Sequence, residues 1–219
     1  MIRLDKRLNA ILNCIPSNSR IIDIGSDHGK IPVAALIKGV TLRAIATDIS
    51  PKSLIKTVKL AEKYGVSDRI ETRCGDGLEI IGENEGDTLI IAGMGANEII
   101  KILDSSHLRF NTYIFTPHQK AVRLRKYLSA SGYIIVSDNK IKSLDKYYDI
   151  IVAKRGTEIL SYRELMLGKS ERGNADFNEF LLFEREKILN KLKGSKSIAN
   201  MAELKKYLEL IDGVIDENK

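Results

Sequence analysis

The chain has 219 residues, with 35 Lys or Arg, 29 Asp or Glu, a formal net charge of +6 and 43% hydrophobic residues. This balance excludes a disordered or collagen-like chain and indicates one substantial domain with an appendage, or two small domains. Apolar runs such as 31–37 are far shorter than the ~20 residues that cross a bilayer, and no apolar signal core opens the chain, so neither membrane association nor secretion is expected. Cys14 and Cys74 lie in separate segments, which fits a reducing cytoplasm and predicts neither a disulfide framework nor a bound metal.

The positive charge is unevenly distributed. Residues 1–156 hold 24 Lys or Arg against 17 Asp or Glu, whereas residues 157–219 hold 11 against 12. A basic first part suits a polyanionic partner such as nucleic acid. A solvated basic surface that binds nothing explains the excess equally well.

Short β-branched segments alternate with helical patterns as far as residue 154. Ser50 before Pro51 predicts a helix N-cap followed by proline in the first turn. Strand–helix alternation at this spacing predicts a parallel sheet covered on both faces, and two final strands without a helix between them predict an antiparallel closing hairpin. The expected fold is therefore α/β, a Rossmann-like doubly wound sheet. The expected strands are 20–24, 41–47, 69–74, 87–92, 111–116, 133–136 and 147–153, and the expected helices are 32–38, 50–64, 97–103 and 118–131.

The pattern becomes helical after Gly156. Ser161 and Glu164 form a capping-box sequence that begins a short helix. A long helix over 177–192 is interrupted at 193–197 and followed by a second helix with a coiled-coil-like apolar seam. We therefore predict two domains, 1–156 and 157–219, the second a helical hairpin. The sequence does not decide whether the hairpin packs within one chain or on a second copy, although a monomer is expected. The seam consists of Ile198, Met201, Leu204, Leu208, Ile211 and Ile215.

The loop after the first strand carries acidic residues where a dinucleotide site would carry glycines. Residues 23–29 read Asp-Ile-Gly-Ser-Asp-His-Gly and lack the second glycine that admits a pyrophosphate. The carboxylates of Asp23 and Asp27 would repel a diphosphate but suit a cationic ligand. S-adenosylmethionine (AdoMet) has a sulfonium and an ammonium group and no phosphate, so it is the favoured cofactor.

Later strand ends supply further candidates for the same crevice, because ligands of doubly wound sheets bind at the carboxyl ends of the strands. Asp48 can accept both ribose hydroxyls and Ile49 can cover an adenine face, while Asp76 can accept from the adenine amine. Small residues at 92–95 let the sulfonium approach the backbone. The competing interpretations are helix capping for the aspartates and close packing for the glycines. The candidate AdoMet-binding residues are Asp23, Gly25, Asp27, Asp48, Ile49, Gly75, Asp76, Gly77, Ala92, Gly93, Met94 and Gly95.

Three motifs resemble one family. The segments Asp-Ile-Gly-Ser-Asp-His at 23–28, Gly-Asp-Gly-Leu-Glu-Ile-Ile at 75–81 and Ile-Ala-Gly-Met-Gly at 91–95 are similar to those of bacterial tRNA adenine-22-N1-methyltransferases. The resemblance covers nearly the whole chain and implies an AdoMet-binding domain followed by a coiled-coil-like helical part. It places 23–27 on the donor loop, Asp48 at the ribose, Asp76 at the adenine and 93–95 beside the methyl group. The sequence departs from the family at Lys30, at Ala96 and at Thr116-Pro117-His118.

Attack of adenine N1 on the donor methyl needs an unpaired or flipped base, because N1 lies on the Watson–Crick edge. Asp27 is the candidate that stabilises the resulting cation or accepts the N6 proton, with His28 as an alternative base. For Asp27 a capping role at the next helix is the competing interpretation. The candidate substrate residues are Lys30, Pro117 and His118 in the pocket and Arg123, Arg125 and Lys126 on tRNA phosphates, with Lys191, Lys193 and Lys196 as further RNA contacts.

Two other functions remain open. The chain could methylate another RNA position or a small molecule, or it could be a non-catalytic AdoMet-binding interaction protein. A tRNA partner is favoured, because the basic excess lies in the part that carries the donor motifs. A cytoplasmic location is favoured by the two separate cysteines.

Overall fold

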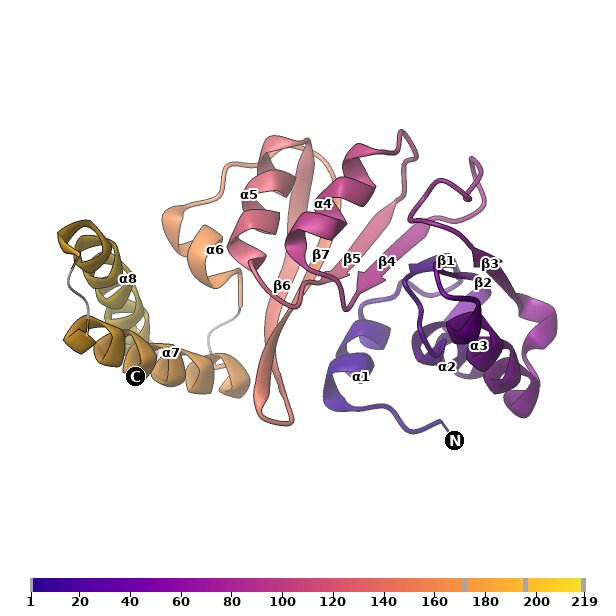
Figure 1. Cartoon of the computed structure of the whole chain (residues 1–219), viewed down its shortest axis with the longest axis horizontal. Helices are drawn as coiled ribbons and strands as arrows, with labels where there is room; N and C mark the ends of the chain where they lie inside the picture. The colour runs from indigo at the N-terminus through magenta and orange to yellow at the C-terminus, as the bar shows by residue number, and fades with distance from the viewer. Residues whose placement is uncertain (1, 171–172, 195–196, 218–219) are drawn as a thin grey trace.

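The computed structural model describes residues 2–170, 173–194 and 197–217. A seven-stranded sheet with helices on both faces is followed by a group of C-terminal helices (Figure 1). The helices are α1 (Lys6–Asn13), α2 (Lys30–Ile37), α3 (Pro51–Tyr64), α4 (Ala96–Asp104), α5 (Ala121–Ala130), α6 (Tyr162–Leu167), α7 (Ala175–Gly194) and α8 (Ile198–Glu217), with a 3-10 turn at Ser67–Arg69. The strands are β1 (Ser19–Ile24), β2 (Thr41–Asp48), β3 (Ile70–Cys74), β4 (Thr88–Ala92), β5 (Thr112–Thr116), β6 (Tyr133–Ser143) and β7 (Lys146–Arg155).

The strand order is β3-β2-β1-β4-β5-β7-β6, with β1 to β5 parallel and β7 antiparallel to both neighbours. β1 pairs with β2 on one side and with β4 on the other, so the chain changes direction across the sheet at the β1–β4 pair. Loops at the carboxyl ends of these strands diverge there and leave a crevice. The predicted doubly wound α/β fold and its antiparallel hairpin are confirmed.

Successive residues of a strand point to opposite faces, and the core divides accordingly. Leu89 and Ile91 of β4 pack with α4 and α5, whereas Ile90 between them packs with α1 and α2 on the other face. All three side chains are fully buried. Burial on both faces explains why the central strands are apolar runs without alternation.

Most predicted boundaries agree with the structure to within two residues, and the exceptions have local causes. The helix expected from 118 begins at Ala121, because Lys120 takes a left-handed φ of 59° and breaks the helical path before it. The hairpin strands are longer than predicted, and α1 was not predicted at all. The predicted caps are confirmed, since Ser50 accepts from the Ser53 amide and Ser161 forms a capping box with Glu164.

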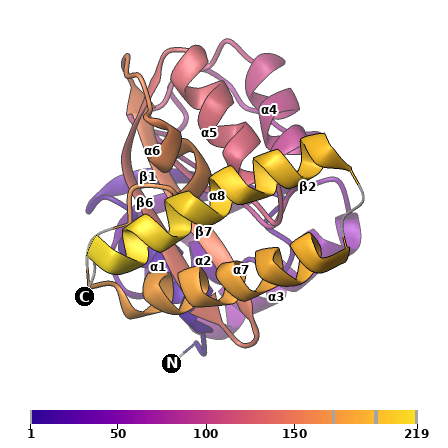
Figure 2. The ribbon, with the colours of Figure 1, turned by 90° about the vertical axis from the view of Figure 1, so that its left-hand side faces the viewer.

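The C-terminal helices pack within the chain. α7 and α8 lie side by side and run in opposite directions, as Figure 2 shows, with a shared apolar cluster that includes Leu181 and Ile211. Leu167 of α6 joins this cluster, and α7 also contacts β6. The hairpin therefore packs against the sheet of its own chain. Lys196, predicted as an RNA contact, lies outside the described residues.

Arg125 was predicted to contact phosphate, and this prediction is wrong. Its side chain is 1% exposed and donates to Asp138 at 2.6 and 3.0 Å and to Asp149 at 2.5 Å. The guanidinium also lies beside the backbone of α6, since its Nη1 donates to the Leu165 carbonyl at 3.4 Å. Arg125 therefore ties α5 to the β6–β7 hairpin from inside the protein, out of reach of a nucleic acid.

Within the described part of the chain, no helix is long and apolar enough to cross a membrane. The same residues contain no cluster of three or more His, Cys, Asp or Glu side chains arranged to hold a metal ion.

Candidate active site

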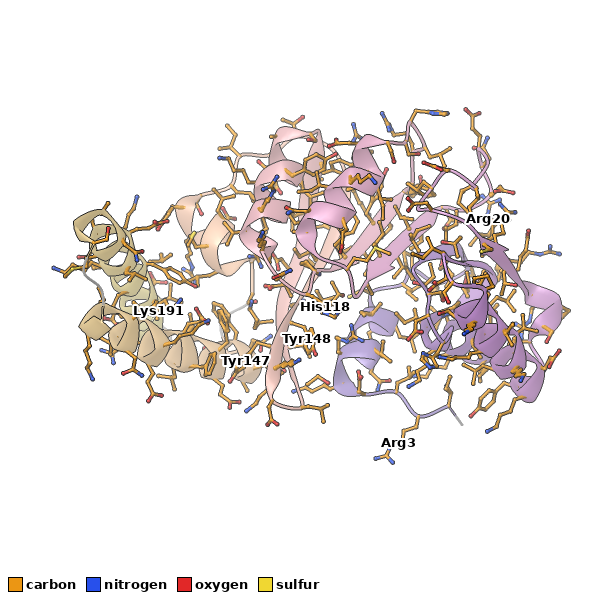
Figure 3. All side chains as sticks on the ribbon, viewed as in Figure 1. Arg3, Arg20, His118, Tyr147, Tyr148 and Lys191 are labelled. Atoms are coloured by element: carbon orange, nitrogen blue, oxygen red, sulfur yellow. The ribbon has the colours of Figure 1, made fainter. Side chains whose placement is uncertain are left out.

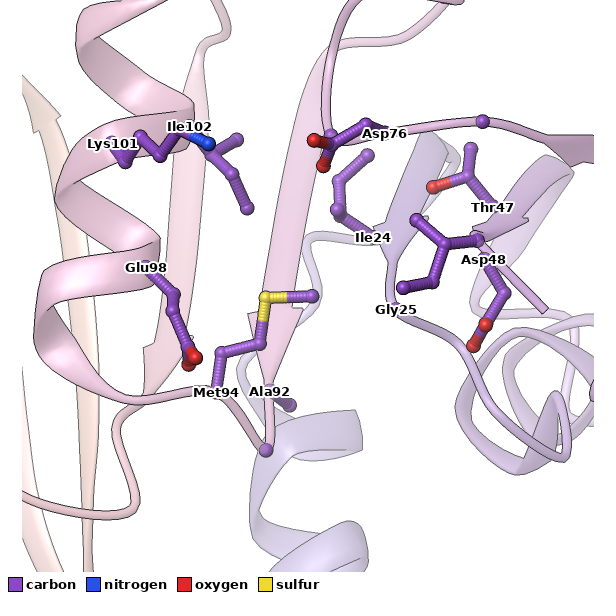
Figure 4. A pocket seen from close by; sticks show the side chains of 14 residues that line it. Ile24, Gly25, Thr47, Asp48, Asp76, Ala92, Met94, Glu98, Lys101 and Ile102 are labelled. Carbon is purple, nitrogen blue, oxygen red and sulfur yellow. The ribbon is translucent and has the colours of Figure 1, made fainter.

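A cavity of about 370 Å³ opens at the carboxyl ends of β1, β2 and β4. Figure 4 shows Asp48 on one side of it, Asp76 on another, and Met94 between them and α4. Nine of the twelve candidate AdoMet-binding residues lie here. The lining consists of Ile24, Gly25, Thr47, Asp48, Ile49, Gly75, Asp76, Gly77, Ala92, Gly93, Met94, Glu98, Lys101 and Ile102.

The Asp48 carboxylate is held by two backbone amides. Its Oδ1 accepts from the Ser50 amide at 2.8 Å and its Oδ2 from the Asp27 amide at 3.0 Å. These bonds orient the carboxylate at the mouth of the cavity and leave further lone pairs on both oxygens. Ile49 next to it is 73% exposed, an apolar side chain at the rim without an apolar cover.

A second cavity, of about 440 Å³, adjoins the first. The two share Gly25, Ala92 and Gly93, so only a short stretch of backbone separates them. The second cavity is polar. Its lining consists of Asp5, Arg7, Leu8, Asp23, Gly25, Ser26, Asp27, His28, Lys30, Ile31, Ala92, Gly93 and His118.

Asp23 is the buried acid of the second cavity. Asp23 is only 3% exposed, and its carboxylate accepts a hydrogen bond from the Ser26 hydroxyl at 2.6 Å. Burial raises the pKa of Asp23 to about 7; the Ser26 bond lowers it and the nearby Asp48 charge raises it further. Near neutral pH this carboxyl therefore exchanges between its neutral and ionised forms.

Asp27 and His28 form a pair at the rim of the second cavity. The His28 Nδ1 contacts the Asp27 carboxylate, and Lys56 Nζ lies 3.2 Å from the His28 Nε2. The capping alternative for Asp27 is wrong, because the N-cap of α2 is Gly29 and has no side-chain bond. Asp27 instead has a left-handed φ of 50°, which turns the loop so that its amide meets Asp48.

Glycine is needed at two positions between the cavities. Gly25 has a φ of +67°, and a Cβ there would lie 2.4 Å from the Met94 Cε. Gly93 has a φ of +93°, and a Cβ there would lie 3.6 Å from the Nε2 of His118, a residue of the second cavity. Both backbone conformations favour glycine. Because neither residue has a side chain, only backbone stands between the two cavities at these positions.

The remaining predicted residues divide between the second cavity and positions outside both. Lys30 and His118 line the second cavity, whereas Gly95 caps α4 and donates its amide to Glu98 at 2.7 Å. Sequence reasoning missed the polar residues Thr47, Glu98 and Lys101 in the first cavity. In the second cavity it missed Asp5, Arg7 and Ser26. Glu98 and Lys101 are three apart, as residues on one helix face are, and this spacing was the available signal. Outside both linings lie Gly95, Pro117, the exposed Arg123 and Lys126, and the buried Arg125.

Comparison with known proteins places this geometry in a family. Residues 4–151 match the family model described as a methyltransferase domain. The chain is 31% identical over 169 residues to the Bacillus subtilis tRNA (adenine(22)-N(1))-methyltransferase, covering 76% of this chain and 71% of that protein. Its structure matches M. capricolum TrmK in complex with S-adenosyl-homocysteine, with a TM-score of 0.87, 26% identity and 99% of each chain covered. It also matches the B. subtilis M1A22 tRNA methyltransferase TrmK, with a TM-score of 0.85, 27% identity and coverage of 98% of this chain and all of that one. The chain therefore belongs to the tRNA (adenine(22)-N(1))-methyltransferase family.

Proposed function

We propose that this protein is an enzyme that transfers a methyl group from AdoMet to N1 of adenine 22 in tRNA. The observation that carries the proposal is the pair of cavities that meet at Gly25 and Gly93. A donor in one and a base in the other would be held face to face across glycine backbone. Such positioning can supply ~7–11 kcal/mol of catalysis in favourable cases.

The residues of the first cavity fit AdoMet. When bound, this cofactor supplies an electrophilic methyl group on a sulfonium. Asp48 would accept the ribose hydroxyls, Asp76 the adenine amine, and the exposed Ile49 would gain an apolar cover from the adenine face. The glycines of this cavity leave room beside the backbone. We assign the donor site to these residues together with Gly25, Gly75, Gly77, Ala92, Gly93, Met94 and the neighbouring Gly95, with Asp23 and Asp27 reaching it from the second cavity.

The second cavity suits the target base. Asp23, Asp27 and His28 face it with two carboxylates and an imidazole, the groups needed beside a ring that gains positive charge on methylation. Asp27 would stabilise that cation or accept the N6 proton. His28 is the alternative base, but its two nitrogens already face Asp27 and Lys56, so Asp27 is the better candidate.

The remaining assignments follow from a tRNA substrate. Lys30 and His118 would contact the target nucleotide, Pro117 would shape the loop that carries His118, and Arg123 and Lys126 would contact phosphates. A tRNA substrate implies a cytoplasmic protein. We further propose that it acts as a monomer, with the donor and acceptor sites in residues 1–156 and the helical hairpin in residues 157–219 forming a second domain.

A labelling experiment tests the proposal. Protein incubated with tritiated AdoMet is expected to label an unmodified tRNA that has A22, with the label recovered as 1-methyladenosine. The same tRNA with G at position 22 is the matched control and is expected to stay unlabelled. Equal labelling of both would reject the position, and no labelling of either would reject the proposed reaction.

Asp76 gives the sharpest test of the donor site. The Asp76→Ala variant is expected to bind AdoMet roughly 10-fold to 150-fold more weakly, because a hydrogen bond to a charged group contributes about 1.5–3 kcal/mol. Isothermal titration calorimetry measures the affinity. Glu79→Ala is the matched control, since Glu79 is an exposed acid in the same loop but lies outside the lining. Equal affinities of the two variants would remove Asp76 from the donor site.

A further inference from the structure

Four aromatic side chains line a third hollow, outside the two cavities. Tyr147 and Tyr148 come from β7, and Phe180 and Phe183 come from α7. This hollow, the aromatic groove, has a volume of about 540 Å³. The chain has only eight Tyr, five Phe and no Trp, so four rings in one surface groove are a marked concentration. Phe180 packs against the α7–α8 cluster, but the core does not explain Phe183, which is 50% exposed.

The aromatic groove is continuous with the second cavity. His118 lines both, and its ring centroid lies 6.5 Å from that of Tyr148. Figure 3 shows Tyr148 beside His118, and Tyr147 on the side of the hairpin that faces α7. The sheet explains this placement. The pairing of β5 with β7 ends at Phe115 and Ile151, so the tip of the hairpin extends past β5, where the loop bearing His118 lies.

The rings form two groups, Tyr148 with His118 and Tyr147 with the two phenylalanines of α7. The Tyr147 ring lies 5.5 Å from those of both Phe180 and Phe183. Aromatic rings partly open to solvent are how proteins bind nucleobases without reading their sequence. An aromatic groove next to the proposed base pocket therefore has the shape and chemistry of a base-stacking surface.

Positive groups border the aromatic groove where a nucleic acid backbone would have to pass. The Arg7 guanidinium lies 5.2 Å from the Tyr148 ring centroid, and Lys187 lies 5.8 Å from that of Phe183. Lys146 also lines the groove. Asp145 and Glu184 line it too, and Glu184 accepts from Lys187 at 2.7 Å. Because that pair cancels its own charge, the positive border rests on Arg7 and Lys146.

His118 stands at the junction of the second cavity and the aromatic groove. Burial lowers the pKa of His118, and the charges of Arg7 and Lys146 lower it further, while Glu98 raises it. These effects favour the neutral form of the His118 ring, which lies between the two sites.

We propose that the aromatic groove binds, by stacking, the bases of the nucleotides that adjoin the target adenine in tRNA. The inference rests on the proposed function, since it takes the second cavity as the base pocket. Extruding a base from a stack costs the stacking of its neighbours. Tyr148 and Phe183 would replace that lost stacking with protein contacts, which favours the extruded state.

A binding cycle tests this proposal. The protein variants are Tyr148→Ala and Phe183→Ala, and the RNA variants are the A22 tRNA with a base-less ribose spacer at nucleotide 21 or at nucleotide 23. Each aromatic substitution is expected to weaken binding of the intact tRNA roughly 5-fold to 150-fold. At least one spacer is expected to weaken binding by the wild-type protein comparably. Combining that spacer with the aromatic substitution is expected to cause little further loss, because both remove the same contact.

The controls separate stacking from loss of structure. Leu182→Ala alters an exposed apolar side chain outside the groove and is expected to bind intact tRNA as the wild type does. Tyr148→Phe keeps the ring and is expected to retain binding. Calorimetric AdoMet affinity is expected to be unchanged in every variant, which shows that each one folds.

Two results would overturn the inference, and they differ from failure of the proposed function. Losses that add fully in the cycle, or no loss in Tyr148→Ala and Phe183→Ala, would show that the bases lie elsewhere. If the wild type still methylates A22 in that case, the proposed function stands and the aromatic groove does not bind the flanking bases. A wild-type protein that binds none of these tRNAs would reject both.

Discussion

Replacing Arg125 with alanine is expected to lower the free energy of unfolding by about 3–5 kcal/mol, because it leaves buried carboxylates without their partner. Asp138 is 1% exposed and loses both of its bonds to the guanidinium, whereas Asp149 keeps Lys140 at 2.5 Å. For a chain of this length the loss corresponds to a fall in melting temperature of roughly 6–20 °C. Urea unfolding followed by circular dichroism measures the free energy directly.

Arg123→Ala and Lys126→Ala are the matched controls, since both residues are basic and exposed on the same helix. Each is expected to change stability by less than about 0.5 kcal/mol. If they contact phosphate, each also weakens tRNA binding and reduces its dependence on salt concentration. An Arg125→Ala protein with wild-type stability and impaired tRNA binding would restore the phosphate role that its burial excludes.

Arg125 also shows where prediction of the fold from the sequence ends. Helical spacing placed the segment correctly, but the sequence does not show that Asp138 and Asp149, 13 and 24 residues further on, turn inward to meet it. A basic residue on an amphipathic helix is normally exposed, so burial of this one depends entirely on the tertiary pairing of β6 with β7. The strand ends needed no such information, because apolar runs followed by Asp or Gly mark them locally.

The candidate site divides in the same way. The acids at strand ends were predictable, because the carboxyl ends of parallel strands must meet at one edge of the sheet. Which cavity each acid faces was not predictable. Asp48 and Asp76 line the first cavity, whereas Asp23 and Asp27 line the second. Between Asp23 and Asp27 the chain bends at Gly25, just after β1, and Gly25 lines both cavities. That bend depends on left-handed conformations, which composition alone does not reveal.

Ionisation of Asp23 is expected to lower the free energy of unfolding and to tighten AdoMet binding as the pH rises through about 7. An unfolded Asp has a pKa near 3.8, and burial raises that of Asp23 to about 7 in the folded protein. Between these values the folded state binds a proton that the unfolded state does not, so stability falls as pH rises. From pH 5 to pH 8 the loss is roughly 2–3 kcal/mol at 1.36 kcal/mol for each pKa unit.

An Asp23→Asn variant removes this titration while keeping an oxygen that accepts from Ser26. Its stability relative to the wild type is expected to increase by the same 2–3 kcal/mol between pH 5 and pH 8, measured by urea unfolding at each pH. AdoMet binding is expected to move the other way. If the carboxylate attracts the cationic donor, wild-type affinity rises about tenfold from pH 6 to pH 8, as the ionised fraction does, and the variant shows no such rise.

The two measurements together distinguish a functional carboxylate from a merely buried one. A stability difference that changes with pH, with an affinity that does not, would leave Asp23 as a buried acid without a role in donor binding. A stability difference between the two proteins that stays constant from pH 5 to pH 8 would show that the carboxyl titrates normally. An apolar or amide side chain in this cavity would not lower stability above pH 7. A carboxyl group at this position is therefore best explained by a role in binding. The expected combination, lower stability and tighter binding from one ionisation, is what a site gains by holding a carboxylate beside a cation.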